Sequence, residues 1–197
     1  MEFLELYPKI KEYALEHGTP IIMEDSLVYI KKIIEERKIK KILEIGTAIA
    51  YSALHFASVS EDVLVDTIER NPEMIMQATK NLEEYDLKKQ IKIHPFDALE
   101  CSLDDFDSEY DLLFIDAAKA QSQRFFERYL PLLKPNALII TDNMNFHNVS
   151  VDDENISKNL RNMLKKIQRY HDWLANHPDF TTEFIDLGDG LAITWRK

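Results

Sequence analysis

The chain has 197 residues, of which 45% are hydrophobic and 30% charged, and this composition is typical of one globular domain spanning residues 1–197. A net charge of −11 argues against a protein that coats nucleic acid non-specifically, and the single cysteine excludes both a disulfide framework and a cysteine-rich zinc site. The sequence has no run of about 18 apolar residues and no signal-peptide pattern, so we expect a cytoplasmic protein that does not span a membrane.

Residues 1–40 predict a helical segment ahead of the first strand. The spacing of apolar and charged residues favours one helix over Phe3–Glu16 and a second over Asp25–Arg37. We expect both helices to pack on the domain or on a partner subunit.

Short apolar runs rich in β-branched residues follow, separated by amphipathic stretches. Asn71 and Pro72 begin one of these stretches, as a helix cap followed by proline at the first helical position. The predicted strands are Lys41–Ile45, Val63–Ile68, Ile91–His94, Leu112–Ile115 and Ala137–Thr141. This alternation predicts an α/β domain with a parallel sheet and helices on both of its faces.

The end of the chain breaks the alternation. Thr181–Asp186 and Leu191–Trp195 flank Gly188-Asp189-Gly190, which predicts an antiparallel β-hairpin. With the hairpin included, the prediction is a Rossmann-like, mostly parallel sheet of seven strands.

Ligands of open parallel sheets bind beyond the carboxyl ends of the strands, so the residues after each strand are the site candidates. Gly46 permits a tight turn after the first strand, but the loop lacks the G-x-G-x-x-G spacing that a pyrophosphate needs. S-adenosylmethionine, which has no phosphate, fits such a loop. Glu69 follows the second strand, where an acid can bind ribose hydroxyls, and Asp97 and Ala98 follow the third, within reach of an adenine ring. An ordinary turn and a solvated loop acid are the alternatives.

The next two strands are followed by acids. Asp116 ends one strand with Lys119 three residues later, and Asp142 and Asn143 end the other. Oxygen ligands of this kind suit Mg²⁺, and a nearby lysine can take a proton or stabilise charge. The alternatives are that Asp116 caps a helix and that Asp142 and Asn143 form a turn.

Basic residues are concentrated in two segments of this acidic chain. Lys158–Arg169 contains five bases and no acid, and Lys31–Lys41 contains six bases beside two acids. Solvated helix faces are one interpretation, and local patches that bind a polyanion are the other.

Several segments together resemble the metal-dependent O-methyltransferases of the catechol and caffeoyl-CoA type, which have the class I methyltransferase fold. They are EIGTAIAYS, IERNPEM, YDLLFIDAAKAQSQRFFERYLPLL and ITDN, and the resemblance runs from about Pro20 to the C-terminus. FIDAAKAQ and DGLAIT are similar to the bacterial branch of tRNA 5-hydroxyuridine methyltransferases in particular. The resemblance implies S-adenosylmethionine and Mg²⁺, or another divalent cation, as cofactors. It also implies a homodimer, with the N-terminal helices at the interface.

The resemblance also implies roles for individual residues. It implies Asp116, Asp142 and Asn143 as metal ligands, and Lys119 as the catalytic base beside Asp116. The donor-binding residues that it implies are Met23, Glu44, Gly46, Ser52, Glu69, Asp97, Ala98 and Asp116.

Two positions depart from the family pattern. The donor loop, which usually ends in Gly-Tyr-Ser, reads Ala50-Tyr51-Ser52, and alanine costs little at position 50 only if its φ is negative. After the acid pair, His147 is followed by Asn148 where glycine is usual, which changes the loop on the substrate side.

We therefore expect an O-methyltransferase that converts 5-hydroxyuridine in a tRNA anticodon loop to 5-methoxyuridine. A small catechol-like substrate is the alternative acceptor, which the acidic net charge mildly favours. An alternative of another class is a module that binds the donor without catalysis. The presence of Asp116, Lys119, Asp142 and Asn143 argues against that module.

Overall fold

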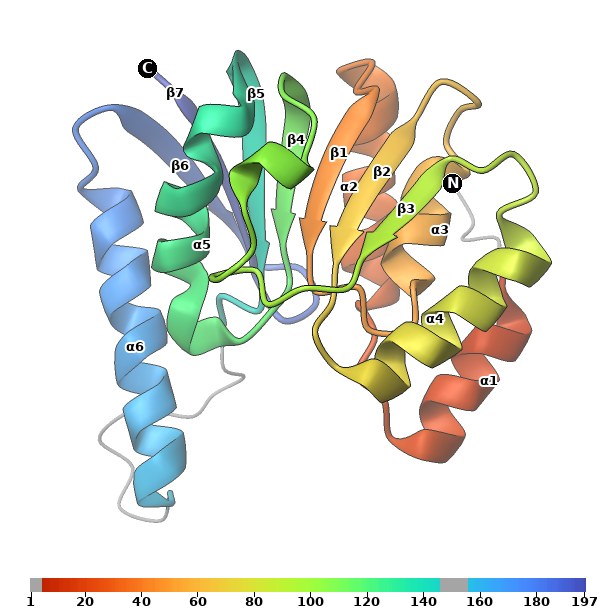
Figure 1. The fold of residues 1–197 in the computed structure, drawn as a ribbon. Coiled ribbons are helices and arrows are strands. Elements are labelled where there is room, and N and C mark those ends of the chain that lie inside the picture. The colour runs from red at the N-terminus through yellow and green to blue at the C-terminus, as the bar shows by residue number, and fades with distance from the viewer. Residues whose placement is uncertain (1–4, 146–155) are drawn as a thin grey trace.

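The structure is a computed structural model that describes residues 5–145 and 156–197. Within these residues the chain forms one seven-stranded sheet in the order β3-β2-β1-β4-β5-β7-β6 (Figure 1). β1 to β5 run parallel, and β7 is antiparallel to both of its neighbours, β5 and β6. The strands are β1 Lys41–Ile45, β2 Leu64–Ile68, β3 Ile91–His94, β4 Tyr110–Ile115, β5 Leu133–Asp142, β6 Phe180–Ile185 and β7 Leu191–Arg196.

Helices cover both faces of this sheet (Figure 1). One face packs against α1 Pro8–His17, α2 Glu24–Glu36, α3 Tyr51–Ala57 and α4 Pro72–Tyr85. The other packs against α5 Ser122–Tyr129, α6 Lys158–Ala175 and the segment that connects β3 to β4. The single-turn helices are η1 Leu103–Asp105, η2 Lys119–Gln121 and η3 Leu130–Leu132.

The central strand β4 illustrates why the strand sequences are apolar throughout. Leu112 and Phe114 belong to the core on the α1–α4 face, whereas Leu113 and Ile115 belong to the core on the α5–α6 face. All four side chains are buried, and burial of each contributes about 1.5–3 kcal/mol. A strand that is covered on both faces therefore shows no alternation of polar and apolar residues.

The predicted fold class is confirmed, including the terminal hairpin, and the differences lie at element ends. β5 begins at Leu133 and not at Ala137, because a register irregularity between β4 and β5 accommodates Pro135. The first helix begins at Pro8, with proline in its first turn, and Phe3, where the prediction began, lies outside the described residues. Asn71 caps α4 as predicted, since its side chain accepts a hydrogen bond from the Glu73 N–H.

The topology determines where a ligand can bind. β1 lies between β2 and β4, so the order of strands reverses beside it, and the loops after β1 and β4 diverge there. Across the part of the chain that the structure describes, no helix is long and apolar enough to cross a membrane.

Candidate active site

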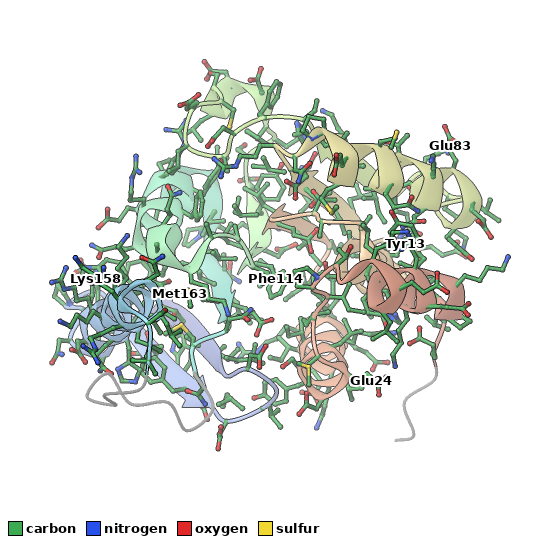
Figure 2. The ribbon with its side chains drawn as sticks, turned by 90° about the horizontal axis from the view of Figure 1, so that it is seen from below. Tyr13, Glu24, Glu83, Phe114, Lys158 and Met163 are labelled. Carbon is green, nitrogen blue, oxygen red and sulfur yellow. The ribbon has the colours of Figure 1, made fainter. Side chains whose placement is uncertain are left out.

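A cavity of about 510 Å³ lies at the carboxyl ends of β1 to β5. Its walls come from the loops after these five strands and from the link between α1 and α2. Figure 2 looks onto this edge of the sheet, with Glu24 at the start of α2 and Lys158 at the start of α6 on opposite sides of the strand ends. The cavity brings together the residues predicted for the site, with Glu44 as the exception: Met23, Gly46, Ser52, Glu69, Asp97, Ala98, Asp116, Lys119, Asp142 and Asn143.

The loop after β1, residues 46–50, crosses the end of β4 at very short range. Gly46 has a φ of 105°, and a Cβ atom there would lie 2.3 Å from the carbonyl oxygen of Asp116. Real Cβ atoms do not approach a backbone oxygen so closely, so glycine is required at this position. Gly46 thus lets the loop lie directly beside the predicted metal-binding residues Asp116, Asp142 and Asn143, which we call the acid rim.

Two alanines in the same loop have left-handed backbone conformations. The φ angle is 44° at Ala48 and 66° at Ala50, and Ala50 is the N-cap residue of α3. For a residue with a Cβ atom this conformation costs about 1–2 kcal/mol. The alanine that replaces the usual glycine at position 50 therefore has a positive φ, which is the conformation in which alanine is costly.

Glu44 lies beneath the cavity and not in its wall. Its side chain is fully buried at the end of β1, and its carboxyl group accepts hydrogen bonds from the hydroxyls of Ser52 and Thr67. Burial raises the pKa of Glu44 to about 7, although both hydroxyls favour the ionised form. Glu44 thus supports Ser52, which does line the cavity, and its implied contact with the donor stays a prediction.

Glu69 organises the turn after β2. One carboxylate oxygen accepts a hydrogen bond from the Ala48 N–H at 3.0 Å, and the other accepts from the N–H groups of Arg70 and Asn71 at 2.9 Å. A carboxylate has about four acceptor positions, so these three bonds leave about one position for a ribose hydroxyl. Glu69 thereby connects the turn after β2 to the loop after β1.

The turn after β3 forms the opposite end of the cavity. Asp97 accepts hydrogen bonds from the Leu99 N–H and from the Arg70 guanidinium, at 2.9 and 2.8 Å. These two bonds hold the pKa of Asp97 below its usual range. The Ala98 carbonyl accepts a hydrogen bond from the Tyr129 hydroxyl, which fixes the turn against α5.

The acid rim is assembled from the ends of β4 and β5. The Asn143 side-chain amide donates to Asp116 at 3.0 Å, and Asn143 has a φ of 64°, which asparagine tolerates. Burial raises the pKa of both Asp116 and Asp142. The charge of Glu44 raises the pKa of Asp116 further, and the charge of Asp116 does the same for Asp142. The positive charge of Lys119 acts in the opposite direction on both.

This geometry decides between the alternatives for Asp116. The next helical turn begins at Lys119 and has no side-chain cap, so Asp116 does not cap a helix. Its carboxylate faces Asn143 across the strand ends instead.

The rim fits a hard divalent cation. Within residues 5–145 and 156–197, no three His, Cys, Asp or Glu side chains form a metal cluster, so the candidate set is two carboxylates and one amide. Rotation of the Asn143 amide by half a turn would point its oxygen toward Asp116, giving the all-oxygen set that Mg²⁺ prefers. The mutual repulsion of Asp116 and Asp142 favours a positive ion between them.

Sequence reasoning missed Asp189 as a residue of the site. Asp189 lies in the β6–β7 turn, lines the cavity, and raises the pKa of Asp116 and Asp142 through its charge. β7 pairs with β5 so that Leu191 lies opposite Asp142, which brings the turn to the acid rim. The sequence signal for Asp189 was its place between Gly188 and Gly190 in the predicted hairpin turn. That signal does not show which strand pairs with β7, so the turn could not be placed beside Asp142 from sequence.

The two basic segments lie at opposite edges of the sheet. Lys31–Lys41 ends at the start of β1, away from the cavity, and three of its lysines pair with Glu36, Asp62 and Asp107. The predicted polyanion patch in this segment therefore lies away from the cavity, and it stays a prediction. The basic part of α6 begins near the cavity, because α6 packs against η2, which carries Lys119. His147 and Asn148 lie outside the described residues.

Comparison with known proteins agrees with this geometry. A family model described as O-methyltransferase matches residues 10–197. The crystal structure of a Staphylococcus aureus protein, described there as a caffeoyl-CoA O-methyltransferase, has a TM-score of 0.91 and 45% identity, and covers 98% of this chain and 93% of that chain. A catechol O-methyltransferase of Niastella koreensis is 32% identical over 120 residues, or 59% of this chain and 54% of that protein. Tapetum-specific methyltransferase 1 of Arabidopsis thaliana is 26% identical over 191 residues, or 92% of this chain and 78% of that protein. The chain belongs to the O-methyltransferase family.

Proposed function

We propose that the protein transfers a methyl group from S-adenosylmethionine to a hydroxyl oxygen of its acceptor, with Mg²⁺ held at the acid rim. The observation that carries this proposal is the single cavity in which the loop after β1 meets Asp116, Asp142 and Asn143. Methyl transfer requires the donor and acceptor atoms to be held in contact and in line, which one shared cavity allows. Its volume of about 510 Å³ lies in the range of small-molecule sites.

The donor end of the cavity is proposed to be the loop after β1 and the turns after β2 and β3. Glu69 accepts a hydrogen bond from a ribose hydroxyl, and the turn at Asp97 and Ala98 borders the adenine. Met23 and Ser52 lie in the wall beside the loop and contact the remainder of the donor.

The acceptor end is proposed to be the acid rim. Asp116, Asp142 and Asn143 hold the ion, and bound Mg²⁺ supplies positive charge that lowers the pKa of a neighbouring hydroxyl. The side-chain nitrogen of Lys119 accepts the proton of the acceptor hydroxyl. The oxygen then bonds to the methyl carbon as the carbon–sulfur bond breaks, and the sulfur keeps that electron pair, so S-adenosylhomocysteine is released.

The proposed acceptor is 5-hydroxyuridine in a tRNA anticodon loop. Support comes from α6, whose five bases between Lys158 and Arg169 have no acid among them. In Figure 1 the first turns of α6 extend beyond the carboxyl ends of the strands, which is the edge of the sheet whose loops line the cavity. A negatively charged backbone could bind there while one exposed base enters the cavity, without the cost of opening a duplex. This acceptor also accounts for the expected cytoplasmic location.

A catechol-type acceptor is the second candidate. The observation in its favour is the identity with a catechol O-methyltransferase over 120 residues. It keeps the same donor site, the same rim and the same role for Lys119, and it makes no use of the bases on α6.

The test is methyl transfer from labelled S-adenosylmethionine, with Mg²⁺ and with a chelator. The acceptors are tRNA that contains 5-hydroxyuridine, the same tRNA with unmodified uridine, and a simple catechol. Label in the first tRNA alone, and with metal alone, supports the proposal. Label in catechol alone assigns the small-molecule acceptor, and label that persists with chelator contradicts the role of the metal.

The α6 surface is tested separately by charge reversal of its exposed lysines. Lys165→Glu with Lys166→Glu should weaken tRNA binding at low salt and reduce the salt dependence of the affinity, because fewer counterions are released. Reversal of Lys40 and Lys88, which lie at the other edge and pair with acids, is the control. Equal effects of both pairs would contradict a local tRNA surface on α6.

We also propose a homodimer that uses the N-terminal helices. Leu15 on α1 and Met76 on α4 are large apolar side chains exposed at 75% and 57%, and an interface would bury them. Sedimentation should give twice the mass of 23.1 kDa, and Leu15→Glu should shift it to the mass of one chain. A wild-type protein of one-chain mass at micromolar concentration would contradict this proposal.

A further inference from the structure

The loop after β1 is held from outside by a buried asparagine. Asn81 on α4 is 7% exposed, and its side-chain amide donates to the carbonyl oxygen of Ile49 at 2.8 Å. Gln77, one helical turn earlier, donates to the other end of the same amide at 3.0 Å, which fixes its orientation. A buried amide with both ends bonded is a defined contact between α4 and this loop.

Ile49 is the residue between the two left-handed alanines. Its side chain is fully buried and its carbonyl faces Asn81 on α4, and Ala48 and Ala50 on either side have φ angles of 44° and 66°. The next residue toward the cavity, Ala48, is itself held by the bond from its N–H to Glu69. The loop is thus anchored on both sides of a conformation that alanine disfavours.

We propose that Asn81 is a positioning residue for the methyl donor: it keeps the loop after β1 in the strained conformation that the donor binds. Asn81 does not line the cavity, whereas Thr47 and Ala48 do. Without the Asn81 bond the alanines relax toward negative φ, and only a fraction of the molecules has the loop in place. The apparent dissociation constant then rises by the inverse of that fraction.

This inference rests on the donor site proposed above, and it differs from a purely structural role of Asn81. If Asn81 only satisfied a polar group in the core, its loss would lower stability and leave donor affinity unchanged. If Asn81 holds a strained loop, the loss of donor affinity on its removal depends on how strained the loop is. Glycine at position 50 adopts a left-handed conformation freely, so Ala50→Gly should make Asn81 dispensable for donor binding.

The experiment measures the binding of S-adenosylhomocysteine by titration calorimetry, with no metal and no acceptor present. We expect about tenfold weaker binding for Asn81→Leu, a corresponding rise in the KM for the donor, and a kcat within twofold of the wild type at saturating donor. In the Ala50→Gly background the same substitution should weaken binding by about twofold or less. Lys80→Gly is the control, because Lys80 is an exposed neighbour on α4 whose loss destabilises the helix without touching the loop.

Each outcome has one meaning. Unchanged affinity in Asn81→Leu, an equal loss in the glycine background, or an equal loss in Lys80→Gly overturns the inference. If Asn81→Leu does not fold, Gln77→Leu takes its place, since it leaves Asn81 present but unoriented, and we expect about threefold weaker binding. Failure of the wild-type protein to bind S-adenosylhomocysteine overturns the proposed donor site itself, whatever the variants do.

Discussion

The buried carboxyl group of Glu44, below the loop after β1, makes the unfolding free energy depend on pH. Replacing Glu44 by glutamine should remove that contribution. Glu44 is fully buried, accepts hydrogen bonds from Ser52 and Thr67, and has a pKa of about 7. Glu44→Gln keeps the size of the side chain and one carbonyl oxygen as acceptor, and it abolishes ionisation. The other hydroxyl can rotate to accept from the new amide group.

The sign follows from where the proton is held more tightly. The folded protein keeps the Glu44 proton up to a pH of about 7, whereas the unfolded chain loses it near 4.5. Ionisation of Glu44 therefore does not lower the unfolding free energy below pH 4.5. Between pH 4.5 and about 7 the unfolding free energy falls as the pH rises, and above about 7 this loss is complete. The interval between the two pKa values corresponds to about 3 kcal/mol, since one unit is worth about 1.4 kcal/mol.

Urea unfolding at pH 5 and at pH 8 measures the effect. At each pH the unfolding free energy of the wild type is subtracted from that of Glu44→Gln. This difference should be about 2–3 kcal/mol larger at pH 8 than at pH 5. Glu12→Gln is the control, because Glu12 is exposed on α1 and should give the same difference at both pH values. An equal difference for Glu44→Gln at both pH values would refute the argument that burial dominates this carboxyl group.

The remaining predictions concern the loop, the rim and the N-terminal segment. Gly46→Ala should lower the unfolding free energy by about 3 kcal/mol or more in urea, because the new Cβ atom meets the Asp116 carbonyl at 2.3 Å; a loss below about 1 kcal/mol would mean that the strands move apart easily. Lys119→Met should lower kcat by about a hundredfold or more with donor affinity preserved in calorimetry, whereas equal loss of donor affinity would contradict its role as base. Tyr51→Phe removes the 2.8 Å hydrogen bond to Glu5 and should cost about 1 kcal/mol in thermal unfolding; no change would show that the N-terminal contact contributes nothing to stability.

The fold could be predicted from sequence because its strands are short apolar runs that alternate with amphipathic helices. The hairpin was also predictable, from Gly188 and Gly190 between two β-rich runs. β5 was predicted too short because Pro135 has no N–H to donate, and only the irregular pairing with β4 shows how the strand includes it. Such a pairing depends on both strands, so it cannot be predicted from the sequence of either strand alone.

The rim was predictable for a topological reason, whereas the details of the loop were not. Asp116 and Asp142 end neighbouring parallel strands, so their meeting follows from strand order alone. Sequence reasoning identifies left-handed positions through glycine. Ala48 gives no such signal, and position 50 was marked only by the glycine that the family usually has there. Asp189 required the further knowledge that β7 lies beside β5.

An alanine at position 50 is tolerable because opposing contributions nearly cancel. The left-handed conformation costs about 1–2 kcal/mol. The methyl group of Ala50 is fully buried in the core around α3, and burial of such a group contributes about 0.8 kcal/mol. Alanine also restricts the unfolded chain more than glycine does, which contributes about 0.4–1 kcal/mol. The chain can therefore depart from the glycine pattern at little cost in stability, provided that contacts such as the Asn81–Ile49 bond keep the loop from relaxing.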